Sequence, residues 1–519
     1  MGLCVPFTWF TFSHLDFVPI WDGWAFTREC FQAAASSGQF RCFGHPAYVP
    51  SALYGLTQLF RDGTVVPIFL INLTLGVVGI GAFRWLIKWA TGDRFARGEL
   101  TLLAFALGLW PTFQIQMVQP GLDYPMTIFF ILMLAALVAR RYIMTAIVGL
   151  AMSFCKEPGI VLYGSSVGLY MLFLAFDGPS GFSFKRVWTD RLWILALPAI
   201  PVVAYVLNFP PQHDAVSWKY VIQSIFSFNF ESSFFRYQLL SAYVINFAWI
   251  FSLMGILGFV LRLAFWLSFP VSRPILPTGV FTVRVSLFVL LNLFALSFLL
   301  TRVEFANNPR YILALLPLLV FLASGFLVLI PVKMFRVGIL MIILVLEVIS
   351  TYRTIDPIAK AKLETFKFGS HSLLQMSVPE NRRISGRGRD QLMYNGEILN
   401  VHYLIQDLVR KHGLDAVYFS DWCMTWIAFD DFRSFDVKTM ERTLSRGSDT
   451  RMIDILIPED FKERFSTPND YPKKAYFIRF PNADICNGLR EYSRYYHVAG
   501  KERFCRGGYC LSVFELRLK

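Results

Sequence analysis

Long apolar runs separated by short polar segments dominate the first 350 residues of the chain. About twenty apolar residues are needed for a helix to cross the hydrocarbon core of a bilayer, and several runs reach or approach that length. The pattern predicts spans at about residues 64–89, 100–118, 124–139, 141–155, 160–176, 192–208, 241–267, 285–302, 310–331 and 336–351. We therefore expect a polytopic α-helical membrane protein with about 10–11 spans.

Residues 1–13 are also apolar, but they are too short to cross a bilayer. No basic segment precedes them and no small-residue cleavage site follows, so a cleaved signal peptide describes them poorly. We expect either a truncated first helix or a start that lies upstream.

The segment from His14 to Pro50 differs from the apolar runs because it is polar and rich in turn formers. It contains the ionisable residues Asp16, Asp22, Arg28, Glu29, Arg41 and His45. Function is often located in loops held by a rigid scaffold, and we interpret this segment as an active-site loop. The alternative is a connector that is polar only because water surrounds it.

Basic residues between the predicted spans indicate the topology. If the spans alternate, one side of the membrane receives Arg140, Arg141, Lys185, Arg186, Arg191, Arg262, Arg273, Arg284, Lys333 and Arg336. The positive-inside rule makes that side cytoplasmic. The external side then receives residues 14–50, 119–123, 209–240, 303–309 and everything after 351.

The apolar runs stop after residue 351, and the remaining chain has the mixed composition of a soluble domain. LIQDLVRKHG predicts an amphipathic helix, and DAVYFSDW, DILIP and YFIRFP predict short strands. We expect a transmembrane domain over 1–351 and an extracytoplasmic α/β domain over 352–519. The basic stretch 381–390 is predicted to be a solvated loop near lipid headgroups.

Composition supports the membrane class and argues against a nucleic-acid-binding protein. Hydrophobic residues make up 55% of the chain, 52 residues are Phe, and the mean hydropathy is +0.49. The formal net charge is +13, but Lys and Arg lie between apolar runs and in the C-terminal region, without a basic stripe interleaved with aromatics.

The eight cysteines do not have the spacing of a zinc site, since CxxC is absent. Four are dispersed in or near the membrane region, and four lie in the C-terminal domain: Cys4, Cys30, Cys42, Cys155, Cys423, Cys486, Cys505 and Cys510. An external domain meets an oxidising compartment, so we expect at least one disulfide among Cys486, Cys505 and Cys510. The sequence leaves their pairing open.

Ionisable residues beside or within apolar sequence are the candidates for chemistry, because charge at membrane depth is costly unless it is paired or functional. On the predicted external side they are Asp22, Asp123, Lys156 with Glu157, His213 with Asp214, and Glu304 with Arg310. Carboxylates and cations together suit the attack of a hydroxyl on a sugar whose leaving group is a lipid-linked phosphate. A carboxylate takes the proton and a cation stabilises the departing phosphate.

Several short motifs resemble the GT-C superfamily of polyprenyl-phosphate-sugar glycosyltransferases, which includes protein O-mannosyltransferases and lipid A aminoarabinose transferases. In chain order they are PIWDGW, SSGQF, GHPAY, QPGLDYP, FCKEPG and PRYILALLP. The resemblance covers about residues 14–350. Gly23 stands where the family usually has a second acidic residue, so this chain departs from the pattern there.

The resemblance implies roles for individual residues. It suggests Asp22 and Asp123 as catalytic carboxylates, with Asp22 as the general base and Asp16 as the fallback. Donor-phosphate contacts are expected from Lys156 and Arg310, with Arg28 and Arg41 as second choices. The expected substrate contacts are His45, Tyr311, Trp24, His213 and Glu304. No metal ligand is assigned and no cofactor is certain, although a divalent metal is compatible with this chemistry.

The sequence thus predicts an inverting glycosyltransferase of a bacterial inner membrane. Its donor would be a polyprenyl-phosphate sugar, and its acceptor an extracytoplasmic glycan, lipid or protein. A transporter or flippase of lipid-linked glycans is the main alternative, but matching halves with broken helices are not evident in the sequence. An O-antigen ligase-like transferase would carry its large loop late in the membrane region, whereas the acidic loop comes first in this chain.

Overall fold

The computed structural model describes most of the membrane region and part of the C-terminal region. The described ranges are 4–15, 26–38, 45–59, 65–175, 191–207, 248–268, 283–302, 309–350, 367–368, 371–372, 392–413, 416–420, 455–456, 461–462, 464–465, 467–479, 488–506 and 509–519, with the single positions Phe17, Gly23, Phe40, Cys42 and Tyr243.

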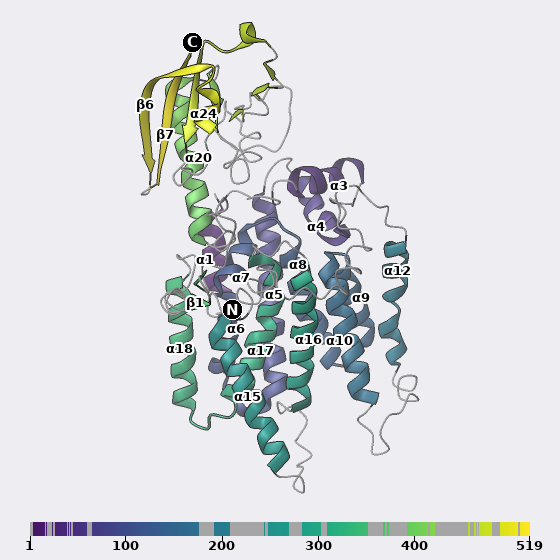
Figure 1. Ribbon diagram of the computed structural model, residues 1–519. Helices are drawn as coiled ribbons and strands as arrows, with labels where there is room; N and C mark the ends of the chain where they lie inside the picture. The colour runs from purple at the N-terminus through teal and green to yellow at the C-terminus, as the bar shows by residue number, and fades with distance from the viewer. Residues whose placement is uncertain are drawn as a thin grey trace.

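Helices form a bundle over the first 350 residues (Figure 1). The longer helices are α5 (Val66–Thr91), α6 (Arg97–Gly108), α8 (Asp123–Val138), α9 (Tyr142–Ser153), α10 (Glu157–Ala175), α15 (Ala248–Ser268), α16 (Val283–Arg302), α17 (Leu315–Leu327) and α18 (Lys333–Ser350). The shorter ones are α1 (Val5–Ser13), η1 (Phe26–Phe31), α3 (Gln32–Ser37), α4 (Tyr48–Gln58), η2 (Gly92–Arg94), α7 (Pro111–Ile115), η3 (Gln116–Val118), η4 (Leu192–Ala196), α12 (Ala199–Leu207) and η5 (Pro309–Ile312).

Each predicted span contains helical structure in its described part, with one correction. The span expected at 100–118 is not continuous, because Arg97–Gly108 and Pro111–Val118 meet at an angle of 70°. Pro111 has no backbone N–H to continue the helix, and Trp110 before it takes a non-helical conformation with ψ of 124°. The proline was visible in the sequence as a break signal within the apolar run.

Three described helices are long and apolar enough to cross a membrane: Val66–Arg94, Glu157–Leu174 and Ala248–Phe265. The bent pair at 97–118 would make a fourth span, and several other apolar helices are shorter. The total number of crossings and their sidedness stay predictions.

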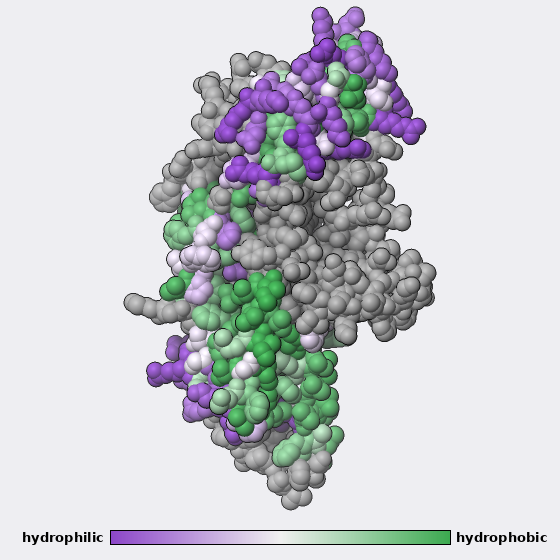
Figure 2. All heavy atoms as spheres, turned by 90° about the vertical axis from the view of Figure 1, so that its left-hand side faces the viewer, coloured by the Kyte–Doolittle hydropathy of each residue, from purple (hydrophilic) through white to green (hydrophobic). Residues whose placement is uncertain are grey.

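Apolar side chains lie both inside the bundle and on its outer surface. Leu103, Phe130 and Leu316 are buried, whereas Phe294 and Ile342 are more than 60% exposed. Figure 2 shows hydrophobic residues over the lower part of the molecule and hydrophilic residues gathered in the upper part. Helices with an apolar outer face are expected where the surroundings are lipid.

The C-terminal region contains a mixed sheet with the strand order β4-β3-β5-β7-β6. Its strands are β3 (Val417–Phe419), β4 (Ile455–Leu456), β5 (Lys474–Arg479), β6 (Tyr496–Arg506) and β7 (Tyr509–Leu518), accompanied by α20 (Leu392–His412), α24 (Gly488–Tyr492) and η9 (Pro468–Asp470). A separate antiparallel pair joins β1 (Lys367–Phe368) to β2 (His371–Ser372). β3 runs parallel to β4 and β5, and β7 runs antiparallel to β5 and β6. The predicted helix and strands are therefore present in an α/β arrangement.

The helix α20 links the sheet to the helical bundle (Figure 1). Near its beginning, Leu399 packs against a buried cluster that contains Phe10 and Phe69 of the bundle. Near its end, Lys411 donates to Glu502 of β6 at 2.7 Å. The two regions are thus joined by one continuous helix as well as by the chain.

A disulfide joins Cys505 and Cys510, which face each other across β6 and β7. This confirms the expectation of a disulfide in the C-terminal domain. Cys486 lies outside the described residues, as do the basic stretch 381–390 and the predicted domain boundary at 351–352.

Candidate functional site

The break between α6 and α7 places Asp123 at the start of the next helix. After the bend at Pro111 the chain continues through η3 to residue 118, and α8 begins at Asp123. The break frees backbone carbonyl groups that a continuous helix would have bonded internally. In a bundle of apolar helices those groups need other partners.

Asn72 of α5 supplies those partners. Its side-chain amide donates to the carbonyls of Gln116 and Gln119 at 3.3 and 3.0 Å, and its oxygen accepts from the Tyr54 hydroxyl at 2.5 Å. Asn72 and Tyr54 are fully buried. Burial raises the pKa of Tyr54, so its hydroxyl stays a neutral donor. This network fixes the broken segment that leads to Asp123.

Asp123 is the centre of a buried charged cluster, which we define as Asp123, Lys156 and Arg310. Lys156 Nζ donates to both carboxylate oxygens of Asp123, at 2.8 and 3.0 Å. Arg310 Nε lies 3.5 Å from the second of these oxygens. The residues are only 1%, 5% and 5% exposed. Three segments far apart in the sequence therefore meet at one carboxylate.

Tyr311 covers the cationic side of this cluster. Its ring centre lies 4.2 Å from Lys156 Nζ and 5.3 Å from the Arg310 guanidinium carbon. A ring face attracts cations and also restricts their motion. Tyr311 is half-buried, whereas the three charged residues are buried, so its ring lies between the cluster and the more exposed surroundings.

The electrostatics of the cluster favour an anion. Two cations and one carboxylate leave an excess of one positive charge among these three side chains. Lys156 directly precedes α10, and Asp123 is the first residue of α8, so two helix N-termini lie at the cluster. The N-terminus of a helix carries partial positive charge and unsatisfied N–H groups.

A second ion pair stands beside the first. His45 Nδ1 lies 2.9 and 3.0 Å from the two oxygens of Glu157, the residue that follows Lys156. The two side chains are 33% and 32% exposed, in contrast to the buried cluster. The backbone N–H of Val49 also donates to the carbonyl of Phe154 at 3.2 Å. The end of the 14–50 loop is therefore docked on the segment that carries Lys156.

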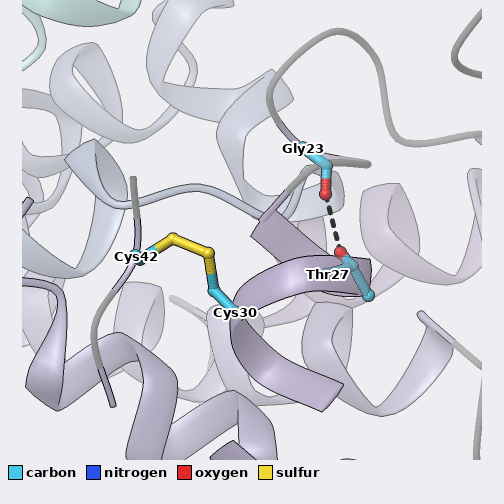
Figure 3. Close-up of a disulfide and its surroundings, with 4 residues drawn as sticks. All are labelled: Gly23, Thr27, Cys30 and Cys42. Atoms are coloured by element: carbon cyan, nitrogen blue, oxygen red, sulfur yellow. Dashed lines mark hydrogen bonds between the residues drawn. A yellow bond between two sulfur atoms is a disulfide. The ribbon is translucent and has the colours of Figure 1, made fainter. Parts of the chain in front are cut away.

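A disulfide between Cys30 and Cys42 lies inside the same loop (Figure 3). Cys30 belongs to η1, in which the Thr27 hydroxyl donates to the carbonyl of Gly23 at 2.7 Å. In the sequence these two cysteines are only two of four dispersed in or near the predicted membrane region. Nothing in their spacing distinguished this pairing from others.

The structure brings together five of the predicted site residues. Asp123, Lys156, Arg310 and Tyr311 form the cluster with its covering ring, and His45 joins it through Glu157. The other candidates lie outside the described residues: Asp16, Asp22, Trp24, Arg41, His213 and Glu304. Arg28 lies in η1, but its side chain is outside the described part.

The sequence did not predict the contacts made by Glu157, Asn72 and Tyr54. Glu157 was noticed only as the neighbour of Lys156 in FCKEPG, and this adjacency was the available signal. Asn72 is a buried polar residue within a largely apolar helix, which is a recognisable mark of a hydrogen-bonding role. Among the described residues, no group of three or more His, Cys, Asp or Glu side chains has the geometry to hold a metal ion.

Comparisons with known proteins give one structural similarity. The chain is similar to the protein in "Crystal Structure of ArnT from Cupriavidus metallidurans bound to Undecaprenyl phosphate", with a TM-score of 0.49 and 14% identity, over 99% of this chain and 97% of that chain. No protein-family model matches the chain, and no curated protein sequence matches it significantly.

Proposed function

We propose that this protein is a membrane glycosyltransferase that moves a sugar from a polyprenyl phosphate to an extracytoplasmic glycan, lipid or protein. The observation that carries the proposal is the buried cluster of Asp123, Lys156 and Arg310 at the start of two helices. A lipid-linked phosphate supplies both an anion for the cations and an apolar chain for the surrounding bilayer. The ordered motifs that resemble the GT-C superfamily support the same activity.

The reaction is a single displacement at the anomeric carbon of the sugar. The acceptor hydroxyl oxygen forms a bond to that carbon while the bond from the carbon to the phosphate oxygen breaks. The electron pair of the broken bond stays on the phosphate, which gains a second negative charge. One displacement from the opposite face inverts the configuration at the anomeric carbon.

Lys156 and Arg310 are proposed to stabilise the departing phosphate. Stabilisation of charge that develops in the transition state contributes strongly to rate, particularly where water is excluded. Both side chains are almost fully buried, and Tyr311 limits the movement of their charged groups. The cations are therefore already in place before charge develops.

Asp123 is better suited to hold these cations than to remove a proton. It accepts two hydrogen bonds from Lys156 and lies 3.5 Å from Arg310, so both of its oxygens are already in contact with cations. We assign the proton transfer to Asp22, which the sequence resemblance suggests and which lies outside the described residues.

The proposal is tested with the full-length protein in lipid nanodiscs, supplied with a panel of polyprenyl-phosphate hexoses and pentoses and with membrane extract as acceptor. We expect release of polyprenyl phosphate together with a glycosylated product of inverted configuration, detected by mass spectrometry and NMR. The transporter alternative predicts movement of the lipid-linked sugar across vesicles without release of polyprenyl phosphate. That result would overturn the proposed activity.

A further inference from the structure

Two consecutive residues connect the buried cluster to the external loop. Lys156 binds Asp123, and Glu157 binds His45, so the two ion pairs are separated by one peptide bond. Glu157 also begins α10, which makes its position as rigid as the helix. A movement of the loop at His45 would therefore act on Glu157, the residue next to the cation proposed to bind the donor phosphate.

The ion pair determines which ring nitrogen of His45 is available to a ligand. The Glu157 carboxylate accepts from Nδ1, so Nδ1 carries a proton. Nε2 has no hydrogen-bond partner within the described part of the chain, and the side chain is about one-third exposed. A protonated imidazole donates from both ring nitrogens, so with Nδ1–H bound to Glu157 that form of the ring would offer Nε2–H to an anionic oxygen of a ligand.

A chain of contacts holds the backbone of His45 in place. Its N–H donates to the carbonyl of Cys42 at 2.7 Å, and Cys42 is bonded to Cys30 in η1. The adjacent Phe31 ring packs against the Tyr54 ring of α4, with centres 4.8 Å apart. The disulfide therefore ties the turn that carries His45 to η1, which is itself packed against Tyr54 and Ile68 of the bundle.

We propose that Glu157 and the Cys30–Cys42 disulfide are positioning elements that hold His45 as a third cationic contact for the phosphate of the lipid-linked ligand. This inference rests on the proposed function. The carboxylate sets the ring orientation, and the disulfide restricts the loop conformations from which the ring could move away. Without either element, His45 would spend less time at the ligand, and affinity would fall without loss of the buried cluster.

Binding of undecaprenyl phosphate to the full-length protein in nanodiscs tests this proposal. The variants are His45→Ala, Glu157→Ala and the double change Cys30→Ser with Cys42→Ser. Each should weaken binding by about tenfold, equivalent to one lost charged contact. Glu157→Gln should recover only part of the affinity, because its amide oxygen still accepts from Nδ1 but the negative charge that favours the cationic ring is gone.

The matched control removes the other described disulfide, by Cys505→Ser with Cys510→Ser, and should leave affinity unchanged. A coupling measurement separates positioning from general stabilisation. If the Cys30–Cys42 disulfide acts through His45, removing it in the His45→Ala background should cause no further loss. An equal loss in both backgrounds, or no loss in either, would overturn the inference.

The two proposals fail in different ways. If the wild-type protein does not bind undecaprenyl phosphate, the proposed function fails, and this inference fails with it. If the wild type binds while the Glu157→Ala and Cys30–Cys42 variants bind equally well, only the positioning role is wrong.

Discussion

Lys156 Nζ donates to both carboxylate oxygens of Asp123, at 2.8 and 3.0 Å, although the residues are 33 positions apart. Each stands at the beginning of a helix, α10 in one case and α8 in the other. The pair therefore joins two helix starts, and it is nearly inaccessible to solvent. Lys156 thus connects two helices and is also the cation proposed to contact the donor phosphate, and substitutions can separate these two roles.

Lys156→Met should weaken binding of undecaprenyl phosphate by about ten- to a hundredfold, because a hydrogen bond to a charged group contributes about 1.5 to 3 kcal/mol. Lys156→Arg keeps the charge and should lose less. The matched control is Lys462→Met, since Lys462 is 62% exposed and distant in sequence from the cluster. Equal affinity in Lys156→Met and the wild type would show that the FCKEPG segment only begins a helix and does not contact the phosphate.

Asp22→Asn should reduce sugar transfer by about a hundredfold or more while leaving undecaprenyl phosphate binding nearly intact. Asparagine caps a helix about as well as aspartate but cannot accept the proton, so the substitution separates a structural from a catalytic role. Initial rates of product formation measure the effect. Transfer at nearly the wild-type rate would show that the base is elsewhere, and Asp123 and Asp16 would be examined next.

The predicted topology places residues 352–519 outside the cell membrane. A cysteine introduced at the exposed position Lys462 should react with an impermeant thiol reagent in intact spheroplasts. A cysteine at the exposed position Lys333, on the predicted cytoplasmic side, should react only after permeabilisation. The reverse labelling pattern would contradict an external active site.

Glu99 and Arg336 form a second buried pair whose role is predicted to be structural. Arg336 Nε donates to Glu99 at 2.7 Å, and the other Glu99 oxygen accepts from the N–H of Ala96 at the start of α6. Arg336→Leu should lower the free energy of unfolding by about 3 to 5 kcal/mol, because it leaves a buried carboxylate without its cation. Glu99→Gln should cost less, since its amide oxygen can still accept one of these bonds.

Reversible unfolding in mixed micelles measures this difference. The exposed pair of Asp407 and Arg410 is the control, and Asp407→Asn should change stability by less than about 1 kcal/mol. Undecaprenyl phosphate binding by folded Arg336→Leu should match the wild type. A specific loss of binding at full stability would instead assign this pair to the site.

The apolar pattern by itself located the helices of the bundle, because continuous hydrophobicity reflects the surroundings of each segment and needs no knowledge of its neighbours. It also predicted the helix α20 and the strands β3, β4 and β5 of the C-terminal region, because alternating and amphipathic patterns are local properties. The run at 100–118 shows the limit of this signal. Mean hydropathy does not register the missing N–H of Pro111, which divides that run into two helices at 70°.

Motif order identified Asp123, Lys156 and Arg310 as candidates, but only tertiary packing decided that two of them bind the third. Arg310 comes 187 positions after Asp123, and Glu157 comes 112 positions after His45. Such contacts depend on which helices are neighbours and on how far along the bundle each helix begins. The hydropathy pattern gives neither of these. The Cys30–Cys42 bond likewise could not be predicted from the sequence. A disulfide requires two cysteines at close range, and only the folded loop brings these two together.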